Sequence, residues 1–399
     1  MDTTTLSRYA DAIVRDGLQI GPGDLLAVHG DPAHRDLVVA LAAAGYRSGA
    51  SYVDSLSVDP RVTKARALGA DPGSLDWRPA WEDERMRAIV EANGGIVWLI
   101  GAEEPDLMAE VPPTAAATTV FERPGLGPYR EAVAAAKARF VVASYPTPAW
   151  AGSVFPELPP EQALERLWAD VLSFARLGPD DPEDGWRRHT EMLEARASAL
   201  SERDLRTLRL RDEHTDLRVT MPAGASWKGG RLLSHGQAYS PNIPTEEVFT
   251  SPDPEGTEGV FHCSRPLEIA GRVIEGIRGE FAAGALTRVD AERATDAEFL
   301  RAYLARDEGA GRLGEIALVD AASRIGQAGR AYRTTLLDEN AASHVAFGFG
   351  FGFCRAPGAP APNVSVIHID VMIGTPQMEV TATDAQGSQH VVMRAGAFV

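Results

Sequence analysis

The first 200 residues alternate between helical and strand-like segments, and this alternation constrains the fold more than any other feature of the chain. Apolar residues recur at helical spacing in four segments, 4–16, 34–48, 80–93 and 127–138. Short apolar, β-branched runs predict strands between them, at 24–29, 51–58, 95–100 and 139–144. Strands that alternate with helices through short connections are typical of a parallel sheet covered by helices. We therefore expect an α/β fold in this half.

The pattern changes near residue 200. Two further helices, expected at 160–176 and 186–200, flank an acidic, proline-rich turn at 177–185. From Asp204 onward the chain consists mainly of short strand-like runs separated by glycines, with one expected helix at 295–308. A chain of 399 residues is long enough for two domains. We expect an N-terminal parallel-sheet α/β domain at 1–200 and a β-rich α+β metal-binding domain at 201–399.

Composition and motifs exclude several classes of function. A formal net charge of −17 argues against a nucleic-acid partner and against anionic membrane surfaces. The N-terminal half contains neither GxGxxG after a strand nor GxxxxGK[ST], so we expect a scaffold and pocket wall there rather than a nucleotide domain. The absence of a GxSxG elbow disfavours a serine hydrolase. Lysine occurs only at 64, 137 and 228, which disfavours Schiff-base chemistry.

The sequence also indicates the compartment. No apolar run reaches 18 residues, and the first residues are acidic and polar rather than basic and then apolar, as in a secretory signal. Cys263 and Cys354 form no CxxC motif and no disulfide framework, so we expect two free buried thiols in a reducing compartment. We therefore expect a cytoplasmic protein.

The segment Ser365–Gly374 carries the clearest chemical motif. Its β-branched run predicts a strand, and residues at i and i+2 of a strand share one face, so His368 and Asp370 point the same way. An imidazole beside a carboxylate can bind a divalent cation if other segments complete the coordination.

Three other segments offer such ligands. Glu246 and Glu247 follow Pro244, which is not compatible with a central strand, and are expected in a loop. Glu315 begins an apolar, strand-like run. In Asp338–His344 the polar residues predict a helix N-terminus that carries both Glu339 and His344. Ordinary interpretations stay open at this point: a helix-capping Glu, a strand-end Glu and a solvated acidic pair.

Taken together, these segments resemble the aminopeptidase T and aminopeptidase S family of thermophilic-type metallo-aminopeptidases. The matching stretches are PNIPTEEVFTSP at 241–252, EGAGRLGEIALVD at 308–320, LLDENAASHVAFG at 336–348 and VIHIDVMIG at 366–374. AAAGYRSGASYVD at 42–54 extends the resemblance more weakly into the N-terminal half.

The resemblance implies a homodimer with two zinc or cobalt ions and a peptide or aminoacyl substrate. The implied ligands are Glu247, Glu315, Glu339, His344, His368 and Asp370, with Glu315 as the bridge. The implied chemistry also needs a carboxylate that accepts a proton from water, for which Glu246 and Glu339 are candidates.

One position departs from the family pattern. Family members usually carry a catalytic tyrosine seven residues after the ENAASH histidine, and this chain has Phe351 there. A phenyl ring cannot donate a hydrogen bond to an oxyanion, so we expect metal binding to survive and peptidase efficiency to fall. Tyr332 is a candidate substitute donor.

Two alternatives follow from these observations. His344, His368 and Asp370 could hold a single iron, as in the dihydroxypyridine ring-cleaving dioxygenases that resemble this family. The presence of Glu247, Glu315 and Glu339 argues against that, because one iron does not need them. The second alternative, suggested by Phe351, is a metal-binding relative with weakened catalysis.

Overall fold

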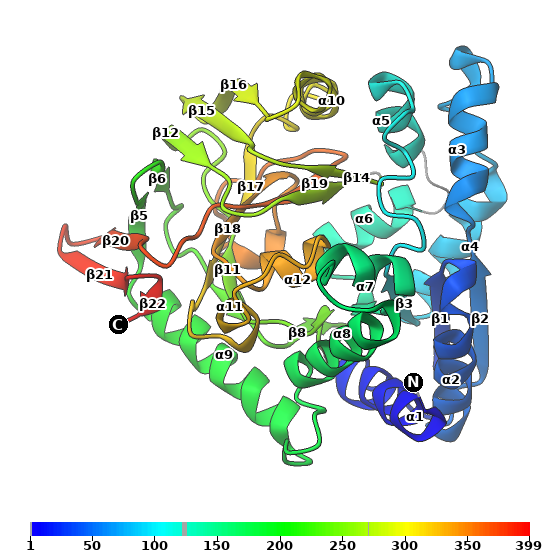
Figure 1. The fold of residues 1–399 in the computed structure, drawn as a ribbon. Coiled ribbons are helices and arrows are strands. Elements are labelled where there is room, and N and C mark those ends of the chain that lie inside the picture. Colours follow the sequence, from blue (N-terminus) through cyan, green and yellow to red (C-terminus); the bar gives the residue numbers. More distant parts are fainter. Residues whose placement is uncertain (1, 122–125, 270) are drawn as a thin grey trace. The chain divides into compact units, whose positions relative to one another are not determined.

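The computed structural model describes residues 2–121, 126–269 and 271–399, which form two compact units (Figure 1). Unit 1 comprises Met1–Thr190, Arg231–Thr245 and Ala270–Arg272. Unit 2 comprises Glu191–Gly230, Glu246–Ile269 and Val273–Val399. The chain thus returns to unit 1 twice after first leaving it. The division into separate domains at 1–200 and 201–399 stays a prediction.

Unit 1 contains a five-stranded parallel sheet with the strand order β10-β4-β3-β1-β2. Its strands are β1 (Leu25–Gly30), β2 (Tyr52–Ser57), β3 (Gly95–Ile100), β4 (Arg139–Ser144) and β10 (Asn242–Ile243). The accompanying helices are α1 (Thr3–Asp11), α2 (Arg35–Arg47), α3 (Pro60–Gly69), α4 (Ala80–Glu91), α5 (Pro113–Phe121), α6 (Leu126–Ala134), α7 (Pro148–Val154) and α8 (Pro160–Phe174). A hairpin of β8 (Leu232–Ser234) and β9 (Gln237–Tyr239) also belongs to this unit. The parallel sheet predicted from the alternating pattern is confirmed.

The core of this sheet explains the apolar strands. Ala27 of β1 and Ile96 of β3 are neighbours in register, and Met86 and Ile89 of α4 pack on them. All four residues are at most 6% exposed. A parallel sheet with helices on its faces buries its strands on both sides, so its strands are almost continuously hydrophobic.

Three helices that begin with proline were not predicted: α3, α5 and α7. Asp59 is the N-cap of α3, and Pro60 is its first residue. The Asp59 carboxylate accepts a hydrogen bond from the Arg61 backbone N–H at 2.9 Å. Proline fits the first helical position because the N–H it lacks would have no partner there, and aspartate is a favoured N-cap.

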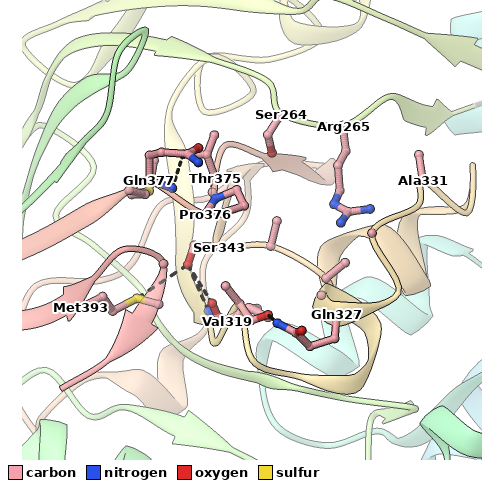
Figure 2. Close-up of a pocket in the computed structure, with 18 of the residues that line it drawn as sticks. Ser264, Arg265, Val319, Gln327, Ala331, Ser343, Thr375, Pro376, Gln377 and Met393 are labelled. Carbon is pink, nitrogen blue, oxygen red and sulfur yellow. Dashed lines mark hydrogen bonds between the residues drawn. The ribbon is translucent and has the colours of Figure 1, made fainter.

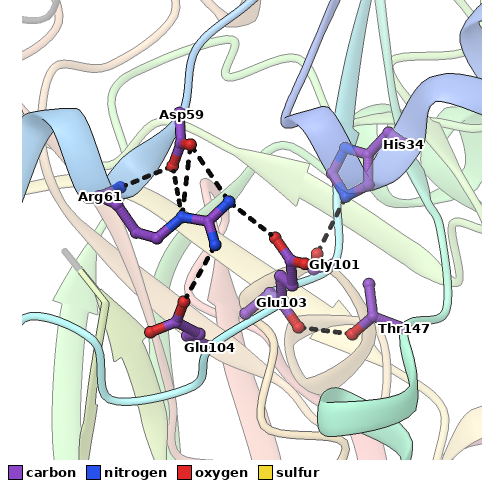
Figure 3. A network of polar contacts seen from close by, with 8 residues as sticks. His34, Asp59, Arg61, Gly101, Glu103, Glu104 and Thr147 are labelled. Carbon is purple, nitrogen blue, oxygen red and sulfur yellow. Dashed lines mark hydrogen bonds and ion pairs between the residues drawn. The ribbon is translucent and has the colours of Figure 1, made fainter.

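The polar groups at the carboxyl ends of β1 and β3 satisfy one another (Figure 3). The buried His34 ring lies 2.9 Å from the Gly101 carbonyl through Nε2, and its Nδ1 accepts from the Asp31 N–H at 3.1 Å. Nearby, Arg61 forms ion pairs with Asp59, Glu103 and Glu104. These interactions are structural.

Unit 2 is built on two antiparallel sheets. The larger has the order β16-β15-β12-β6-β5-β20-β21-β22, and Figure 1 shows green β5 beside red β20, which follows it by more than 160 residues. Its strands are β5 (Leu205–Arg211), β6 (Asp216–Thr220), β12 (Thr257–His262), β15 (Arg278–Ala282), β16 (Ala285–Asp290), β20 (Glu379–Asp384), β21 (Gln389–Arg394) and β22 (Ala397–Phe398). This is the β-rich part that the sequence predicted.

The smaller sheet, with the order β19-β18-β17-β11-β7, carries the candidate ligands. Its strands are β7 (Lys228–Gly229), β11 (Glu247–Thr250), β17 (Leu313–Val319), β18 (His344–Gly348) and β19 (His368–Met372). The remaining elements are α9 (Gly185–Glu202), which crosses the boundary between the units, α10 (Ala294–Leu304), α11 (Arg324–Gln327), α12 (Thr335–Glu339), β13 (Leu267–Ile269) and β14 (Arg272–Ile274). Every residue of β17 and β18 is buried, so this sheet is a rigid support.

Two further expectations can be compared with the structure. Within the described ranges, no helix combines the length and apolar character needed to cross a bilayer. Cys263 and Cys354 are both buried and both free, as predicted.

Candidate metal centre

The candidate ligands on β18 and β19 lie on one face of the smaller sheet. Ala346 lies opposite Asp370, and Gly348 lies opposite His368. Side chains directly opposite each other in a sheet share a face, as do side chains at i and i+2 of one strand. His344, two residues before Ala346, therefore points to the same side as His368 and Asp370. The predicted common orientation of His368 and Asp370 is confirmed.

Glu315 lies on this face next to a β-bulge in β17. From Glu315 to Ala317 the register with β18 is regular, so Glu315 lies opposite Ala346 and shares a face with Ala317, which lies opposite His344. The register shifts by one residue between Leu313 and Glu315. The bulge therefore marks the point from which β17 keeps the regular register that directs this carboxylate toward the imidazoles.

The bulge requires glycine at position 314. A Cβ atom there would lie 2.2 Å from the Phe349 carbonyl oxygen and 2.4 Å from that of Gly348. Both obstacles are backbone atoms, which cannot rotate away. A glycine inside a strand often marks such a close approach.

Glu247 is the first residue of β11 and lies opposite Val319 of β17, on the ligand face. The prediction of a loop was therefore wrong for Glu247, because the strand starts directly after the loop that contains Pro244 and Glu246. Strand pairing with β17 outweighs the local effect of the proline.

The side chains converge in two groups that share one carboxylate. The ligand atoms of Glu247, Glu315 and His344 lie within 4.8 Å of one another, and so do those of Glu315, His368 and Asp370. Their oxygen and imidazole donors suit zinc-like divalent cations. The residues present therefore fit the metal site that the sequence predicts.

Individual distances place a carboxylate beside each imidazole. His344 Nε2 lies 3.1 Å from Glu247 Oε2, and His368 Nε2 lies 3.0 Å from Glu315 Oε2. Asp370 Oδ1 lies between the two rings, 3.8 Å from His344 Nε2 and 3.6 Å from His368 Nε2.

The opposite nitrogen of each ring faces the backbone. His344 Nδ1 lies 3.1 Å from the Ala342 carbonyl, and His368 Nδ1 lies 2.9 Å from the Phe349 carbonyl. A carbonyl oxygen only accepts hydrogen bonds, so each Nδ1 carries a proton. Nε2 is then the nitrogen presented to a metal, which is the usual arrangement of a ligating histidine.

Glu339 reaches the cluster from outside the sheet. It ends α12, and its buried carboxyl group is hydrogen-bonded to Asp370 and accepts from Asn340 Nδ2 at 3.3 Å. The prediction of a helix N-terminus at Asp338–His344 was wrong: the helix ends at Glu339 and β18 begins at His344. The small residues between them form a turn, since pairing of β18 with β17 and β19 fixes His344 in a strand.

Glu246 lies beside the cluster without joining either group of three. Its backbone N–H donates to Asn340 Oδ1 at 2.7 Å, and its side chain interacts electrostatically with Arg196. Asn340 therefore connects the segments that carry Glu246 and Glu339.

Burial controls the protonation of the carboxyl groups. It raises the pKa of Glu315 to about 7 and, with the nearby charge of Asp370, raises the pKa of Glu339 well above its usual range. Burial also acts to raise the pKa of Asp370, but the charge and hydrogen bond of His368, the charge of His344 and the hydrogen bond of Glu339 together outweigh it, and the pKa of Asp370 is lowered.

Burial acts on the imidazoles in the opposite direction. It acts to lower the pKa of His344, but the hydrogen bond and charge of Glu247, together with the charges of Asp370 and Glu315, outweigh it and raise that pKa to about 9. The pKa of His368 is also raised, against burial, chiefly by Asp370. The cluster thus stabilises positive charge, which is what a cation site requires.

A cavity of about 490 Å³ in unit 2 is lined in part by the turn between Glu339 and His344 (Figure 2). Its wall includes Ala341, Ala342 and Ser343 but none of the six predicted ligands. The Ser343 hydroxyl lies 3.1 Å from the Val319 N–H and 3.4 Å from its carbonyl, and thereby connects the end of β17 to the start of β18.

Arg265 lines the same cavity and is hydrogen-bonded to the segment that precedes Glu339. Its guanidinium donates to Asp338 Oδ1 at 3.1 Å, and the fully buried Asp338 also accepts from the backbone N–H groups of Tyr332 and Thr334. No sequence pattern indicated Arg265, Asp338 or Ser343 as supports of the site. Gly314, a glycine within a strand pattern, carried a recognisable signal that was not used.

Phe351, at the position of the family tyrosine, lies beside the cluster. Its ring centroid is 5.2 Å from that of His368 and 5.1 Å from that of Phe353, on which it stacks. Tyr332, the proposed substitute donor, is completely buried.

Comparisons with known proteins agree with this geometry. The model of the thermophilic metalloprotease (M29) family matches residues 2–398. Aminopeptidase T of Thermus aquaticus is 33% identical, with 100% of this chain and 99% of the relative covered. Aminopeptidase T of Thermus thermophilus is 34% identical over 99% of this chain and 98% of its own length.

Solved structures give the same result. Wild-type AmpT from Thermus thermophilus superimposes with a TM-score of 0.85 at 32% identity, with 99% of both chains covered. The 2,5-dihydroxypyridine dioxygenase from Pseudomonas putida KT2440 covers 100% of this chain and 98% of its own, with a TM-score of 0.54 and 15% identity, and shares the fold alone. With the family model matched along almost its whole length and relatives above 30% identity, the chain belongs to the thermophilic metalloprotease (M29) family, a family of hydrolases.

Proposed function

We propose that the protein is a binuclear aminopeptidase that releases N-terminal amino acids from peptides or aminoacyl amides. The observation that carries this proposal is the pair of three-residue groups that share Glu315. A carboxylate common to two groups suits a bridge between two cations, the arrangement used by two-metal hydrolases.

Two sets of residues would hold the ions. Glu247, Glu315 and His344 would hold one ion, and Glu315, His368 and Asp370 would hold the other. Glu339, hydrogen-bonded to Asp370, is the sixth predicted ligand. The mixture of carboxylates and imidazoles favours zinc or cobalt.

Two divalent ions supply, when bound, polarisation of the scissile carbonyl and acidification of a water molecule. The chain itself must hold the proton that this water loses. Glu246 is one candidate, because it lies in neither group of three and its backbone N–H donates to Asn340. Glu339, which also contacts Asn340, is the other candidate only if it does not bind metal directly.

A mononuclear iron site is the second candidate. It is favoured by Asp370, whose carboxylate lies within 4 Å of both imidazole Nε2 atoms. Glu247 and Glu315 lie closer to those nitrogens, at 3.1 and 3.0 Å, and a single iron would leave both carboxylates buried without a cation.

Metal content and substrate range distinguish the binuclear aminopeptidase from the mononuclear iron dioxygenase. We expect two zinc or cobalt ions per chain by elemental analysis, and hydrolysis of aminoacyl-p-nitroanilides that a chelator abolishes and added metal restores. One iron per chain with ring cleavage of a dihydroxypyridine would establish the dioxygenase instead. Two metals without hydrolysis of any aminoacyl or peptide substrate would contradict the aminopeptidase proposal.

Phe351 is expected to limit the rate. An oxyanion donor contributes about 2.7–4 kcal/mol in the transition state, or roughly 100–1,000-fold in rate. Phe351→Tyr returns a hydroxyl to the ring that neighbours His368, and we expect kcat to rise at least about tenfold at unchanged metal content.

Phe353→Tyr is the matched control, because it adds the same hydroxyl to the stacked neighbouring ring. Vigorous hydrolysis by the wild type with no gain from Phe351→Tyr would show that another group, such as Tyr332, already serves as donor.

We also propose a homodimer in the cytoplasm. The resemblance to the family supports the dimer, and the two free, buried cysteines support the location. Sedimentation equilibrium measures the oligomeric state, and cell fractionation measures the location.

A further inference from the structure

Lys228 lies on the same face of the sheet as the candidate ligands. It belongs to β7, the edge strand beside β11, and it lies directly opposite Phe249. Phe249 in turn follows Glu247 by two residues, so both point to the ligand face. The Lys228 side chain therefore starts one strand beyond the strand that carries Glu247, at a strand spacing of about 4.8 Å.

The ammonium group of Lys228 lies near the buried Cys354, and its charge acts to lower the pKa of that thiol. Among the residues that the structure describes, the ammonium group makes no hydrogen bond and no ion pair, although the side chain is partly buried. Of the other two lysines, Lys64 is paired with Glu110, and Lys137 is exposed. A partly buried cation without a protein partner is available for a ligand.

An aromatic wall connects this cation to the candidate metal centre. The Phe351 ring centroid lies 5.2 Å from that of His368. On its other side Phe351 stacks on Phe353, with the two centroids 5.1 Å apart. Phe249, opposite Lys228, contacts both rings, at 5.5 and 6.4 Å. Phe351 and Phe353 remain partly exposed, so this wall can contact a ligand.

The turn that carries these rings is fixed to the strand of Lys228. The Cys354 carbonyl accepts a hydrogen bond from the Ser226 N–H at 2.9 Å, two residues before Lys228. On the other side, the Phe351 N–H donates to the Ser251 hydroxyl at 2.7 Å. The aromatic wall and the lysine therefore belong to one rigid part of unit 2.

We propose that Lys228 binds the free C-terminal carboxylate of a short peptide whose N-terminus lies at the candidate metal centre. This inference rests on the proposed aminopeptidase function and specifies its substrate class as di- and tripeptides. An extended peptide spans about 3.3–3.6 Å per residue. Two or three residues therefore match the path from the His368 ring over Phe351 to Phe353, along which successive ring centroids are 5.2 and 5.1 Å apart. In a chain of net charge −17, a substrate carboxylate needs a local cation, and a lysine on a flexible stem supplies one.

The test compares one peptide with and without its terminal charge. Lys228→Met removes the ammonium and keeps an unbranched side chain. With Leu-Gly-Gly we expect KM to rise about tenfold and kcat to stay unchanged, since a charge-assisted hydrogen bond is lost in binding alone. With Leu-Gly-Gly-amide, we expect neither constant to change.

Two further variants complete the design. Lys228→Arg keeps the charge and should retain the preference for the free acid. Lys137→Met removes the same charge from an exposed position and should leave both substrates unaffected. Metal content and circular dichroism of each variant verify the fold, and Lys228→Gln replaces Lys228→Met if the latter does not fold.

The outcomes separate this inference from the function on which it rests. If the wild type is active and Lys228→Met changes KM equally for acid and amide, the carboxylate role is wrong. If kcat falls equally for both, Lys228 serves the reacting carbonyl instead, and the inference is overturned. If the wild type with two metals cleaves neither peptide nor amide, the aminopeptidase proposal itself fails, and this inference fails with it.

Discussion

Glu315→Gln is expected to lower the rate of peptide hydrolysis at least about 100-fold, the typical order for losing a catalytic metal contact. The amide keeps the size of the carboxylate but removes the charge that two cations would share. Because Glu315 belongs to both groups of candidate ligands, occupancy of at least one metal site should fall. Elemental analysis and kcat on an aminoacyl-p-nitroanilide measure the two effects.

Glu379→Gln is the control for this experiment. It makes the same chemical change at an exposed position that begins β20, and it should alter neither metal content nor rate. Unchanged turnover and two bound metals in Glu315→Gln would show that Glu315 is an ordinary buried carboxylate and does not bridge two metals.

Gly314→Ala is expected to eliminate metal binding although no ligand is changed. The added methyl group would lie 2.2 Å from a backbone oxygen, so β17 must either move away from β18 or lose its bulge. In either case Glu315, the next residue, is displaced from the imidazoles. We expect a loss of about 3 kcal/mol of stability by denaturant unfolding, and no bound metal by elemental analysis.

Gly311→Ala serves as the comparison, because its nearest neighbour would be 3.6 Å from the new Cβ atom, an ordinary contact. A Gly314→Ala protein that keeps both metals and wild-type stability would show that the bulge does not position Glu315.

The N-terminal sheet could be predicted because its inner strands β1, β3 and β4 are largely buried on both faces. β3 and β4 have the bounds that the sequence predicts, since Gly95–Ile100 and Arg139–Ser144 are nearly unbroken apolar runs. Helices α3, α5 and α7 could not be found in the same way, because each begins with a proline, which is more often a sign of a turn, and has at most 10 residues. α8 also begins with a proline, but its 15 residues are long enough to show helical spacing of apolar residues.

The site was only partly predictable, for a different reason. His368 and Asp370 share a face through the period of one strand, which is local information. The orientation of Glu315 depends on the register with β18, and the position of His344 in a strand depends on pairing with β17 and β19. Such pairings join residues far apart in the sequence, so local propensity around Asp338–His344 gave a helix that tertiary contacts override.

The bulge and the four ligand strands have a consequence for how the protein folds. Glu247 and Asp370 are separated by more than 120 residues, and they meet only after four strands have paired across long loops. Non-local antiparallel pairing is slow, because chain entropy is lost before contacts compensate for it. A cation that recognises this cluster therefore recognises the finished sheet, and its binding energy opposes unfolding without guiding the early steps of folding.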